Sequence, residues 1–562
     1  MENLHSDIES VRVLVALLAE KGIRQVVLSP GSRNAPLSVT MAREPGLQHF
    51  VIPDERSAAF FALGLAQQSG RAVALACTSG TALLNYAPAV AEAYYQGVPL
   101  IILSADRPSE WIDQDDGQTI RQQGALANFT KYSGQLPEQI STKTDRWFVN
   151  RLVNEAVNRA TEGHKGPVHL NIPLREPLYQ FHHAAPQTPH LIRQASTFTQ
   201  LTPEEAVRLQ TTCSHTAKIM LVAGFQAPDP VLQKQLASLS TLPQVVVLTE
   251  SLANLQLPEG IPTIDRVLST LPAEQEAIFS PDLLITFGGA VISRQLKAFL
   301  RRNPPHQHWH IDQRPQCPDT YQSLTLHINM APRNFFQQLG LPEAVRSEYH
   351  EWWQAQKCLA RQRHEAFIRE LPWCDLKAFS LLLPAIPPAM HVQLGNSTPV
   401  RYAQLFEHQT FATTRGNRGT SGIDGCTSTA IGACIGAQLP TLLVTGDISF
   451  LYDSNALWIK YRSPLLRIIV MQNGGGSIFR FLPGPSALDE VEELFETPYS
   501  LDIEQLARLH GFQTFTASNE EELLHLLPLF FQPHERPALL LIQTTGRANG
   551  EILKTYFKYL QQ

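Results

Sequence analysis

The chain has 562 residues, of which 43% are hydrophobic and 17% charged, and this corresponds to about three globular domains with several buried cores. The composition, with 32 glycines and 40 prolines, suits many tight loops and excludes a collagen-like, coiled-coil or disordered chain. The 45 basic and 51 acidic side chains leave a formal charge of −6 without a dense Lys/Arg tract, so we expect no nucleic-acid partner.

The segment 1–21 mixes acids with an amphipathic pattern of apolar residues, which predicts a first helix. No apolar stretch approaches the roughly 18 residues that span a bilayer, so we expect no membrane span. The seven cysteines are scattered and never form a CxxC pair, which favours buried reduced thiols over zinc ligands or disulfides. We therefore predict a cytoplasmic protein.

Short apolar runs alternate with helical periods in the first part of the chain. The predicted strands are QVVL, HFVI, AVALAC and PLIILSA, with predicted helices over 56–66 and 82–95 between them. Runs of this kind are typical of parallel strands joined by helices. A strand at 168–172 closes this unit, and the polar, Pro-containing stretch 182–203 is predicted to be a linker.

The same alternation returns twice. A second unit carries the predicted strands KIMLVAG, QVVVLT, LLITFGG and HWHID, followed by helical signals between 343 and 369. A third unit carries TLLVTG, LRIIVMQ and ALLLIQT. We predict an α/β fold of three successive domains, over 1–185, 200–345 and 375–562, with mainly parallel sheets flanked by helices.

One candidate site lies after two strands of the third unit. Asp447 directly follows TLLVTG, and Asn473, which three glycines follow, comes after LRIIVMQ. A single βαβ passage puts both residues at the same sheet edge, where ligands bind in open parallel sheets. A carboxylate, an amide oxygen and glycine carbonyls are hard ligands that suit Mg²⁺ holding phosphate oxygens. An ordinary strand-end turn explains the same residues, so both interpretations stay open.

Charged residues follow other strands as well. Asp54, Glu55 and Arg56 open the helix after HFVI, where acids serve either for capping or for chemistry. Four arginines come soon after predicted strands or turns: Arg33, Arg107, Arg401 and Arg418. One such arginine is typically a surface ion pair, but four favour a site for carboxylates, since a charge-assisted pair contributes about 1.5 to 3 kcal/mol.

A histidine cluster gives a weaker signal. His306, His308 and His310 share one face if HQHWH is a strand, which is compatible with a metal. The two prolines before it and Asp312 after it favour an exposed strand end instead. The sequence has no GxSxG, GxxxxGK or GxGxxG motif, so a serine hydrolase, a P-loop NTPase and a typical NAD enzyme lose support.

Eight segments together resemble the thiamin-diphosphate-dependent enzymes. They are LSPGSRNAPL, DERSAAFFALGLA, TSGTALLNYAPAVAEA, SADRPSE, GQTIRQ, NRGTSGIDG, GDISFLYDSNAL and NGGGSIFRFLP. The GD…N pair alone indicates only this wide superfamily. The SPGSR, GQTIRQ and NRGTSGIDG blocks resemble its 2-succinyl-5-enolpyruvyl-6-hydroxy-3-cyclohexene-1-carboxylate synthase family, which serves menaquinone biosynthesis.

The resemblance implies pyrimidine-binding, central and diphosphate-binding domains in that order. It implies that Glu55 hydrogen-bonds N1′ of the cofactor's aminopyrimidine ring, which favours the imino tautomer that removes the thiazolium C2 proton. Asp447, Asn473 and the carbonyl of Gly475 match the ligands of Mg²⁺ or Mn²⁺. Further implied cofactor contacts are Ile423, which props the bent conformation, Ser449 and Ile478.

The implied reaction is decarboxylation of 2-oxoglutarate and conjugate addition of the resulting carbanion to isochorismate. Ser397, Arg401 and Arg418 match residues that hold the oxoglutarate-derived carboxylate and the intermediate. Residues matching positions that face isochorismate are Ser32, Arg33, Arg107, Gln118 and Arg294, with Ile478 and Phe479 as the apolar wall. A homodimer or dimer of dimers, with active sites at the subunit interface, is implied too. Two alternatives stay open: another carboligase or 2-oxoacid decarboxylase with this cofactor, and a non-catalytic relative that only binds it.

Overall fold

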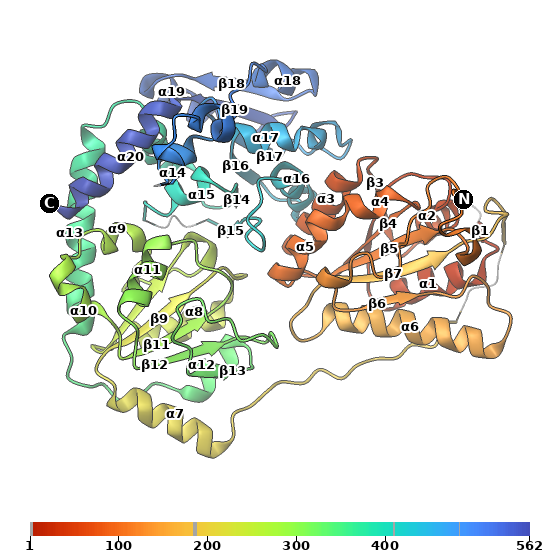
Figure 1. Ribbon diagram of the computed structural model, residues 1–562, viewed down its shortest axis with the longest axis horizontal. Helices are drawn as coiled ribbons and strands as arrows, with labels where there is room; N and C mark the ends of the chain where they lie inside the picture. The colour runs from red at the N-terminus through yellow and green to blue at the C-terminus, as the bar shows by residue number, and fades with distance from the viewer. Residues whose placement is uncertain (1–3, 184–187, 408–410, 483) are drawn as a thin grey trace. The chain divides into compact units, whose positions relative to one another are not determined.

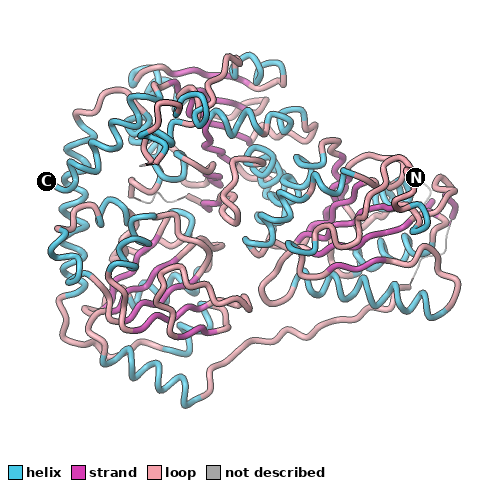
Figure 2. The backbone as a smooth tube through the Cα atoms, in the orientation of Figure 1, coloured by secondary structure: helices cyan, strands magenta, loops and turns pink. Residues whose placement is uncertain are grey.

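The computed structural model describes residues 4–183, 188–407, 411–482 and 484–562. Among the described residues, three sheets of five or six strands follow one another along the chain, and helices flank each of them (Figures 1 and 2). This arrangement confirms the predicted α/β class with mainly parallel sheets. Within the described ranges, no helix has both the length and the apolar character needed to cross a membrane.

The first sheet has six strands in the order β3-β2-β4-β5-β7-β6, all paired in parallel. Their bounds are β2 (Gln25–Leu28), β3 (Gln48–Val51), β4 (Val73–Cys77), β5 (Leu100–Asp106), β6 (Ser133–Gln135) and β7 (Val168–Pro173). All predicted strands of this unit are confirmed, and the short β6 is additional. Strands β4, β5 and β7 are buried along their whole length because helices cover both faces.

Helices on the two faces of this sheet are α1 (Glu9–Glu20), α2 (Ala35–Arg43) and α6 (Lys143–Thr161) on one side, and α3 (Glu55–Ser69) and α5 (Ala87–Gln96) on the other (Figure 1). The helical prediction for 82–95 is confirmed, although the segment is divided: α4 (Thr81–Asn85) ends before Tyr86, and α5 begins after it. The Tyr86 hydroxyl is buried and donates to the Ala76 carbonyl oxygen at 3.0 Å. A small antiparallel pair, β1 (Leu4–Ser6) with β8 (Phe181–His183), joins the ends of this segment.

The second sheet has five parallel strands in the order β10-β9-β11-β12-β13. Its strands are β9 (Ile219–Ala223), β10 (Val245–Thr249), β11 (Leu283–Phe287), β12 (Gln307–Ile311) and β13 (Leu326–Ile328). Its helices are α7 (Pro203–His215), α8 (Pro230–Leu239) and α12 (Pro332–Leu339) around one apolar cluster, and α9 (Ile264–Leu268), α10 (Glu276–Phe279), α11 (Arg294–Arg302) and α13 (Tyr349–Arg369) around the other. Residues 188–202 carry no helix or strand, as expected of a linker.

The predicted exposed strand end is found at His306, which directly precedes β12 and is exposed, but the prediction is wrong for His308 and His310. Strand β12 is interior because the short β13, which the sequence pattern does not reveal, pairs with its outer edge. His308 and His310 are only 1% and 6% exposed, and both bond the hydroxyl of Thr286, at 2.9 and 2.8 Å. In the part of the chain that the structure describes, no three His, Cys, Asp or Glu side chains are grouped to hold a metal ion.

The third sheet has six strands in the order β15-β14-β16-β17-β19-β18. They are β14 (His391–Leu394), β15 (Thr413–Arg415), β16 (Thr441–Gly446), β17 (Leu466–Gln472), β18 (Gln513–Ala517) and β19 (Ala538–Gln543). The three predicted strands are confirmed as β16, β17 and β19. The helices of this segment are α14 (Asp375–Ala385), α15 (Thr398–Ala403), α16 (Cys426–Ala437), α17 (Asp447–Tyr452), α18 (Ile503–Leu509), α19 (Glu520–Phe530) and α20 (Gly546–Gln561).

The described residues form two compact units. Unit 1 takes in Met1–Ser196, Asn417–Thr441 and Ser449–Leu466, and unit 2 takes in Thr197–Gly416, Leu442–Ile448 and Arg467–Gln562. Helix α16 contacts α3 within unit 1. Each sheet lies within one predicted domain, whose bounds at 1–185, 200–345 and 375–562 stay a prediction.

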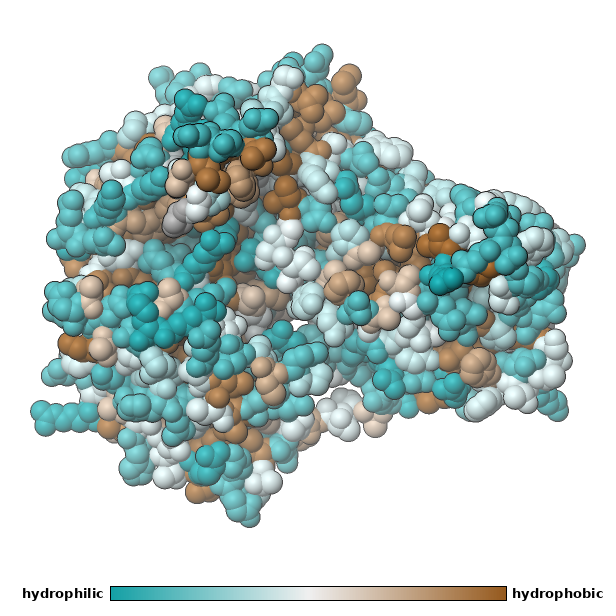
Figure 3. Space-filling view, viewed as in Figure 1, coloured by the Kyte–Doolittle hydropathy of each residue, from teal (hydrophilic) through white to brown (hydrophobic). Residues whose placement is uncertain are grey.

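Apolar side chains gather in buried clusters against the sheets. On the face drawn in Figure 3, hydrophobic residues are scattered among hydrophilic ones. Five of the seven cysteines are buried, as predicted, whereas Cys317 and Cys358 are exposed.

Candidate active site

Asp447 lies at the carboxyl end of β16, where it is 2% exposed. Its Oδ2 accepts hydrogen bonds from the backbone N–H groups of Gly474 and Gly475, at 2.9 and 3.1 Å, and from the Tyr499 hydroxyl at 2.9 Å. Its Oδ1 accepts one from the Ile448 N–H at 2.7 Å. The predicted strand-end carboxylate and the glycine loop after β17 are therefore in direct contact.

Glycine is required in this loop. Gly474 and Gly475 have φ values of +86° and +143°, where side-chain-bearing residues are strained. A Cβ atom on Gly475 would also lie 2.4 Å from the carbonyl oxygen of Glu496. The loop can thus turn its carbonyl groups and N–H groups toward a ligand at short range.

Asn473, between β17 and the glycines, is oriented by a residue that the sequence analysis misses. Its Nδ2 donates to Oδ2 of Asp375 at 2.9 Å, and Asp375 is 1% exposed. Among the described residues, the buried Oδ1 of Asn473 has no hydrogen-bond partner. A buried oxygen without a donor is costly unless a ligand satisfies it.

The charges at this edge also fit a cation. Burial raises the pKa of Asp447, although hydrogen bonds from Tyr499 and the backbone oppose the shift. Burial raises the pKa of Asp375 to about 6, and the nearby charge of Asp447 contributes to the shift. The Asp447 carboxylate and the unsatisfied amide oxygen of Asn473 are hard oxygen donors that suit a divalent cation such as Mg²⁺, and the buried Asp375 carboxylate beside them adds negative charge.

A cavity of about 50 Å³ lies in the same unit, and its lining includes Arg401 and Ile478. Ser397, just before α15, has φ 72° and ψ −124°, a strained conformation of the kind that clusters at functional sites. Its carbonyl oxygen accepts a hydrogen bond from Nη1 of Arg401 at 2.7 Å. Asp265 also lines the cavity, where burial raises its pKa and the charge of Arg401 lowers it. Arg401 and Ile478, both predicted to contact substrate, therefore line the same cavity.

Phe479 and Arg294, the other two predicted substrate residues of unit 2, are not among the described residues that line this cavity. Phe479 packs on Phe495 with ring centroids 5.4 Å apart, next to the cavity-lining Ile478. Arg294 is exposed at the start of α11. The Ser293 hydroxyl before it donates to the carboxylate of Asp265.

Glu55 is the first residue of α3 in unit 1, and it is half-buried. The helix is capped by Asp54, whose carboxylate accepts the Ser57 N–H at 2.8 Å. Since Asp54 performs the capping, Glu55 is not needed for it, which favours the chemical interpretation over the structural one. Burial raises the pKa of Glu55, so its protonated form persists to higher pH than that of an ordinary glutamate.

Three more predicted residues lie in the parts of unit 1 that come from the third segment. The Ser449 hydroxyl donates to the carbonyl oxygen of Ile423 at 2.6 Å, so these two predicted cofactor contacts touch each other. Arg418 is 8% exposed, and its loop is held by Glu92, which accepts the N–H groups of Gly419 and Thr420 at 2.6 and 2.7 Å. The sequence analysis misses Glu92, although a carboxylate on the apolar face of a helix indicates a buried polar contact.

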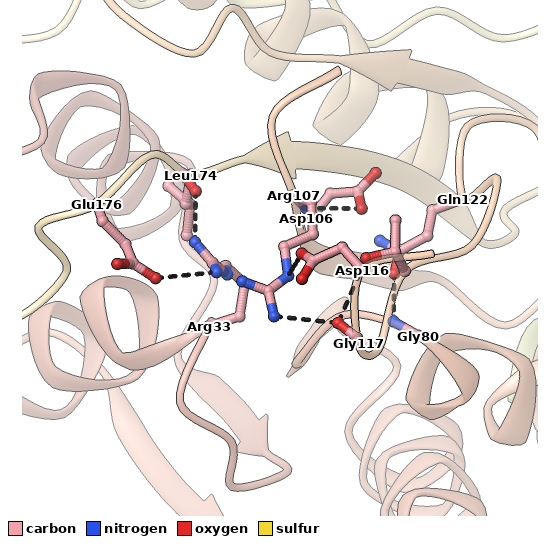
Figure 4. Close-up of polar contacts among 10 residues, drawn as sticks. Arg33, Gly80, Asp106, Arg107, Asp116, Gly117, Gln122, Leu174 and Glu176 are labelled. Carbon is pink, nitrogen blue, oxygen red and sulfur yellow. Dashed lines mark hydrogen bonds and ion pairs between the residues drawn. The ribbon is translucent and has the colours of Figure 1, made fainter. Parts of the chain in front are cut away.

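Arg33 and Arg107 follow β2 and β5 of the first sheet, and Figure 4 shows their polar contacts. Arg33 is 5% exposed and donates from Nη1 to the Leu174 carbonyl oxygen at 2.9 Å. It also pairs with Glu176 at 3.2 Å. Arg107 donates from Nη2 to the Gly117 carbonyl oxygen at 3.0 Å, so it is tied to the loop that carries Gln118. Ser32, beside Arg33, is exposed.

Gln118 lies in a loop held in an unusual conformation. Asp113, Asp115 and Gln118 all have positive φ values, between 55° and 62°. Gln122 anchors the end of this loop: it is 1% exposed, accepts the Gly80 N–H at 2.8 Å and donates to Oδ1 of Asn171 at 3.0 Å. Gln122 is a third residue whose role the sequence analysis misses, although it is the last residue of the GQTIRQ segment quoted there.

Comparison with known proteins defines the class. Residues 8–126 match the family model "Thiamine pyrophosphate enzyme, N-terminal TPP binding domain", and residues 191–380 match "Middle domain of thiamine pyrophosphate". The chain is therefore a thiamine pyrophosphate (thiamin diphosphate) enzyme.

Full-length relatives define the family. A 2-succinyl-5-enolpyruvyl-6-hydroxy-3-cyclohexene-1-carboxylate synthase of Porphyromonas gingivalis is 46% identical, over 100% of this chain and 98% of that protein. Proteins of the same description from Flavobacterium johnsoniae and Bacteroides thetaiotaomicron are 39% and 38% identical, over 99% and 100% of this chain and 100% of theirs. The chain belongs to the 2-succinyl-5-enolpyruvyl-6-hydroxy-3-cyclohexene-1-carboxylate synthase family.

Proposed function

We propose that the chain decarboxylates 2-oxoglutarate and adds the remaining four-carbon unit to isochorismate, giving 2-succinyl-5-enolpyruvyl-6-hydroxy-3-cyclohexene-1-carboxylate for menaquinone biosynthesis. The observation that carries this proposal is the arrangement in unit 2. There the buried Asp447–Asn473 edge, with its unsatisfied oxygen, is linked to a cavity that contains Arg401, because Asn549 both lines the cavity and accepts the N–H of Asp375. A metal-binding edge beside a carboxylate-binding cavity suits a cofactor and an anionic substrate.

The proposed roles follow from the chemistry of each group. Asp447, Asn473 and the Gly475 carbonyl hold Mg²⁺ or Mn²⁺ with the cofactor diphosphate, and Ile423, Ser449 and Ile478 contact the cofactor. When bound, thiamin diphosphate supplies a carbanion nucleophile and the electron sink for loss of CO₂. Glu55 holds a proton at N1′ of the aminopyrimidine ring.

The cationic side chains orient two polyanionic substrates. Ser397, Arg401 and Arg418 are proposed to hold the carboxylate derived from 2-oxoglutarate. Residues proposed to face isochorismate are Ser32, Arg33, Arg107, Gln118 and Arg294, with Ile478 and Phe479 as the apolar wall. Arg33 and Arg107 already bond carbonyl and carboxylate oxygens, so they are placed by the protein before a substrate arrives.

An isochorismate assay tests the proposal. Purified protein with thiamin diphosphate, Mg²⁺, 2-oxoglutarate and isochorismate should consume the ultraviolet absorbance of isochorismate, and omission of any component should abolish the change. Release of succinic semialdehyde with isochorismate untouched would instead support the 2-oxoacid decarboxylase. If calorimetry finds metal-dependent cofactor binding but the assay shows neither release of succinic semialdehyde nor consumption of isochorismate, the non-catalytic relative is supported.

We also propose a homodimer, or a dimer of dimers, in which Glu55 of one subunit and Asp447 of another complete each site. Glu55→Gln and Asp447→Asn variants, each inactive alone, should regain about a quarter of wild-type activity after their subunits are mixed and reassorted, because half the dimers would then be mixed and carry one intact site. Sites built within single chains would show no recovery. The measurement is isochorismate consumption, with light scattering to confirm the dimer.

We propose the cytoplasm as the compartment, because the seven cysteines are scattered and form no CxxC pair, a pattern that suits reduced thiols.

A further inference from the structure

Asp375 is a buried acidic residue to which the proposed reaction assigns no role. It is the first residue of α14 and is almost fully buried, but Cys374 is the residue before it that caps the helix. Its carboxylate turns instead toward Asn473 and Thr544, which come from the ends of β17 and β19. Among the described residues, this buried carboxylate neither caps its helix nor pairs with a cationic side chain, so its contacts with Asn473 and Thr544 are the ones that indicate its role.

The side chain of Asp375 is held in a closed ring of hydrogen bonds. The Thr544 hydroxyl donates to its Oδ1 at 2.5 Å, and its own backbone N–H donates to Oδ1 of Asn549 at 2.8 Å. Asn549 in turn donates from Nδ2 to the Thr544 hydroxyl at 3.1 Å. Because every member has a partner, the carboxylate has one orientation, with Oδ2 facing Asn473.

The fixed carboxylate of Asp375 determines how the side-chain amide of Asn473 is oriented. An amide has a donor end and an acceptor end, and a carboxylate can only accept. Asp375 therefore selects the NH₂ end, at 2.9 Å, and leaves Oδ1 on the opposite side, buried and without a partner among the described residues. If the amide turned over, an NH₂ group would face the position proposed for the cation and could not coordinate it.

We propose that Asp375 is a positioning residue that presents the oxygen of Asn473, rather than its nitrogen, to the divalent cation. The inference rests on the metal site of the proposed function. It adds a residue outside the coordination sphere, and such partners of metal ligands typically tune affinity by about 10- to 100-fold.

Asp375→Asn is the direct test, because it changes one oxygen to an NH₂ group at nearly constant volume. Thr544 keeps an acceptor at Oδ1, so the new NH₂ faces Asn473 and favours the turned amide. Binding of Mn²⁺ in the presence of thiamin diphosphate, followed by the paramagnetic resonance signal of free Mn²⁺, should weaken by about 10- to 100-fold. Asp502→Asn, which removes an exposed carboxylate of the same unit, should leave Mn²⁺ affinity unchanged.

The reciprocal swap separates positioning from a merely structural role. In Asp375→Asn/Asn473→Asp the NH₂ of residue 375 donates to one oxygen of residue 473, and the second oxygen faces the cation. Mn²⁺ affinity should return to within about threefold of wild type, since the outer hydrogen bond and an oxygen ligand are both restored. A swap that binds Mn²⁺ as weakly as the single variant would overturn the proposal, as would a single variant with wild-type affinity.

Two controls keep these outcomes distinct. If Asp375→Asn does not fold, as judged by thermal unfolding, the swap alone decides by the same Mn²⁺ measurement. If the wild-type protein shows no Mn²⁺ binding with thiamin diphosphate, the metal site of the proposed function fails, which is a different result from failure of Asp375 as its positioning residue.

Discussion

Glu55→Gln should lower turnover by about 100-fold or more while changing thiamin diphosphate affinity by no more than about tenfold. The amide keeps the size of the side chain and can still hydrogen-bond a ring nitrogen, but it cannot share a proton with that nitrogen. Asp54 caps α3, so the helix should survive the change. Steady-state rates of isochorismate consumption and calorimetric titration with the cofactor measure the two effects.

The pH dependence provides a second readout for Glu55. Burial raises the pKa of this carboxyl, and the form that carries a proton is populated below that pKa. Activity that depends on the proton is therefore present at lower pH and is lost as the pH rises through the raised value. The Glu55→Gln variant should lack this loss, and Asp54→Asn, which retains Glu55, should keep it. If turnover is unchanged in Glu55→Gln, Glu55 does not hold the proton at N1′ as proposed.

The strands that position the site could be predicted because they are continuous apolar runs. Strands β4 and β5 are buried on both faces, so every residue in them is apolar or small until the polar carboxyl end. The same pattern identified β16 and β17, and the strand ends then led to Asp447 and Asn473. Strand β13 escaped prediction because its three residues, Leu326–Ile328, are too few to show a period.

The supporting residues of the site could not be predicted from local pattern. Asp375 and Asn473 are separated by 98 positions, and Glu92 and Gly419 by 327, so no helical or strand period links them. A buried hydrogen bond between distant loops depends on how the sheets bring their edges together. Only the residue types indicate such contacts: Glu92 interrupts an apolar helical face, and Asp375 is a charged residue at the start of a helix of mainly apolar residues.

Asp447→Asn should abolish activity and weaken metal-dependent cofactor binding by more than about 100-fold. Asp447 accepts hydrogen bonds at both oxygens, from Ile448 at Oδ1 and from two glycine N–H groups and Tyr499 at Oδ2. In either orientation an asparagine turns its NH₂ toward at least one of these donors, so the carboxylate cannot be replaced without disturbing the glycine loop.

Thermal unfolding with and without ligands provides a decisive measurement for Asp447. A ligand at 100 times its dissociation constant stabilises a folded protein by about 2.7 kcal/mol, so wild type should unfold at a higher temperature with Mg²⁺ and thiamin diphosphate than without them. Asp447→Asn should lose that increase, whereas Asp502→Asn should retain it, because its carboxylate caps α18 and is exposed. A full ligand-induced increase in Asp447→Asn would contradict the metal site, since the side chain that carries the charge at this edge would then be dispensable for binding.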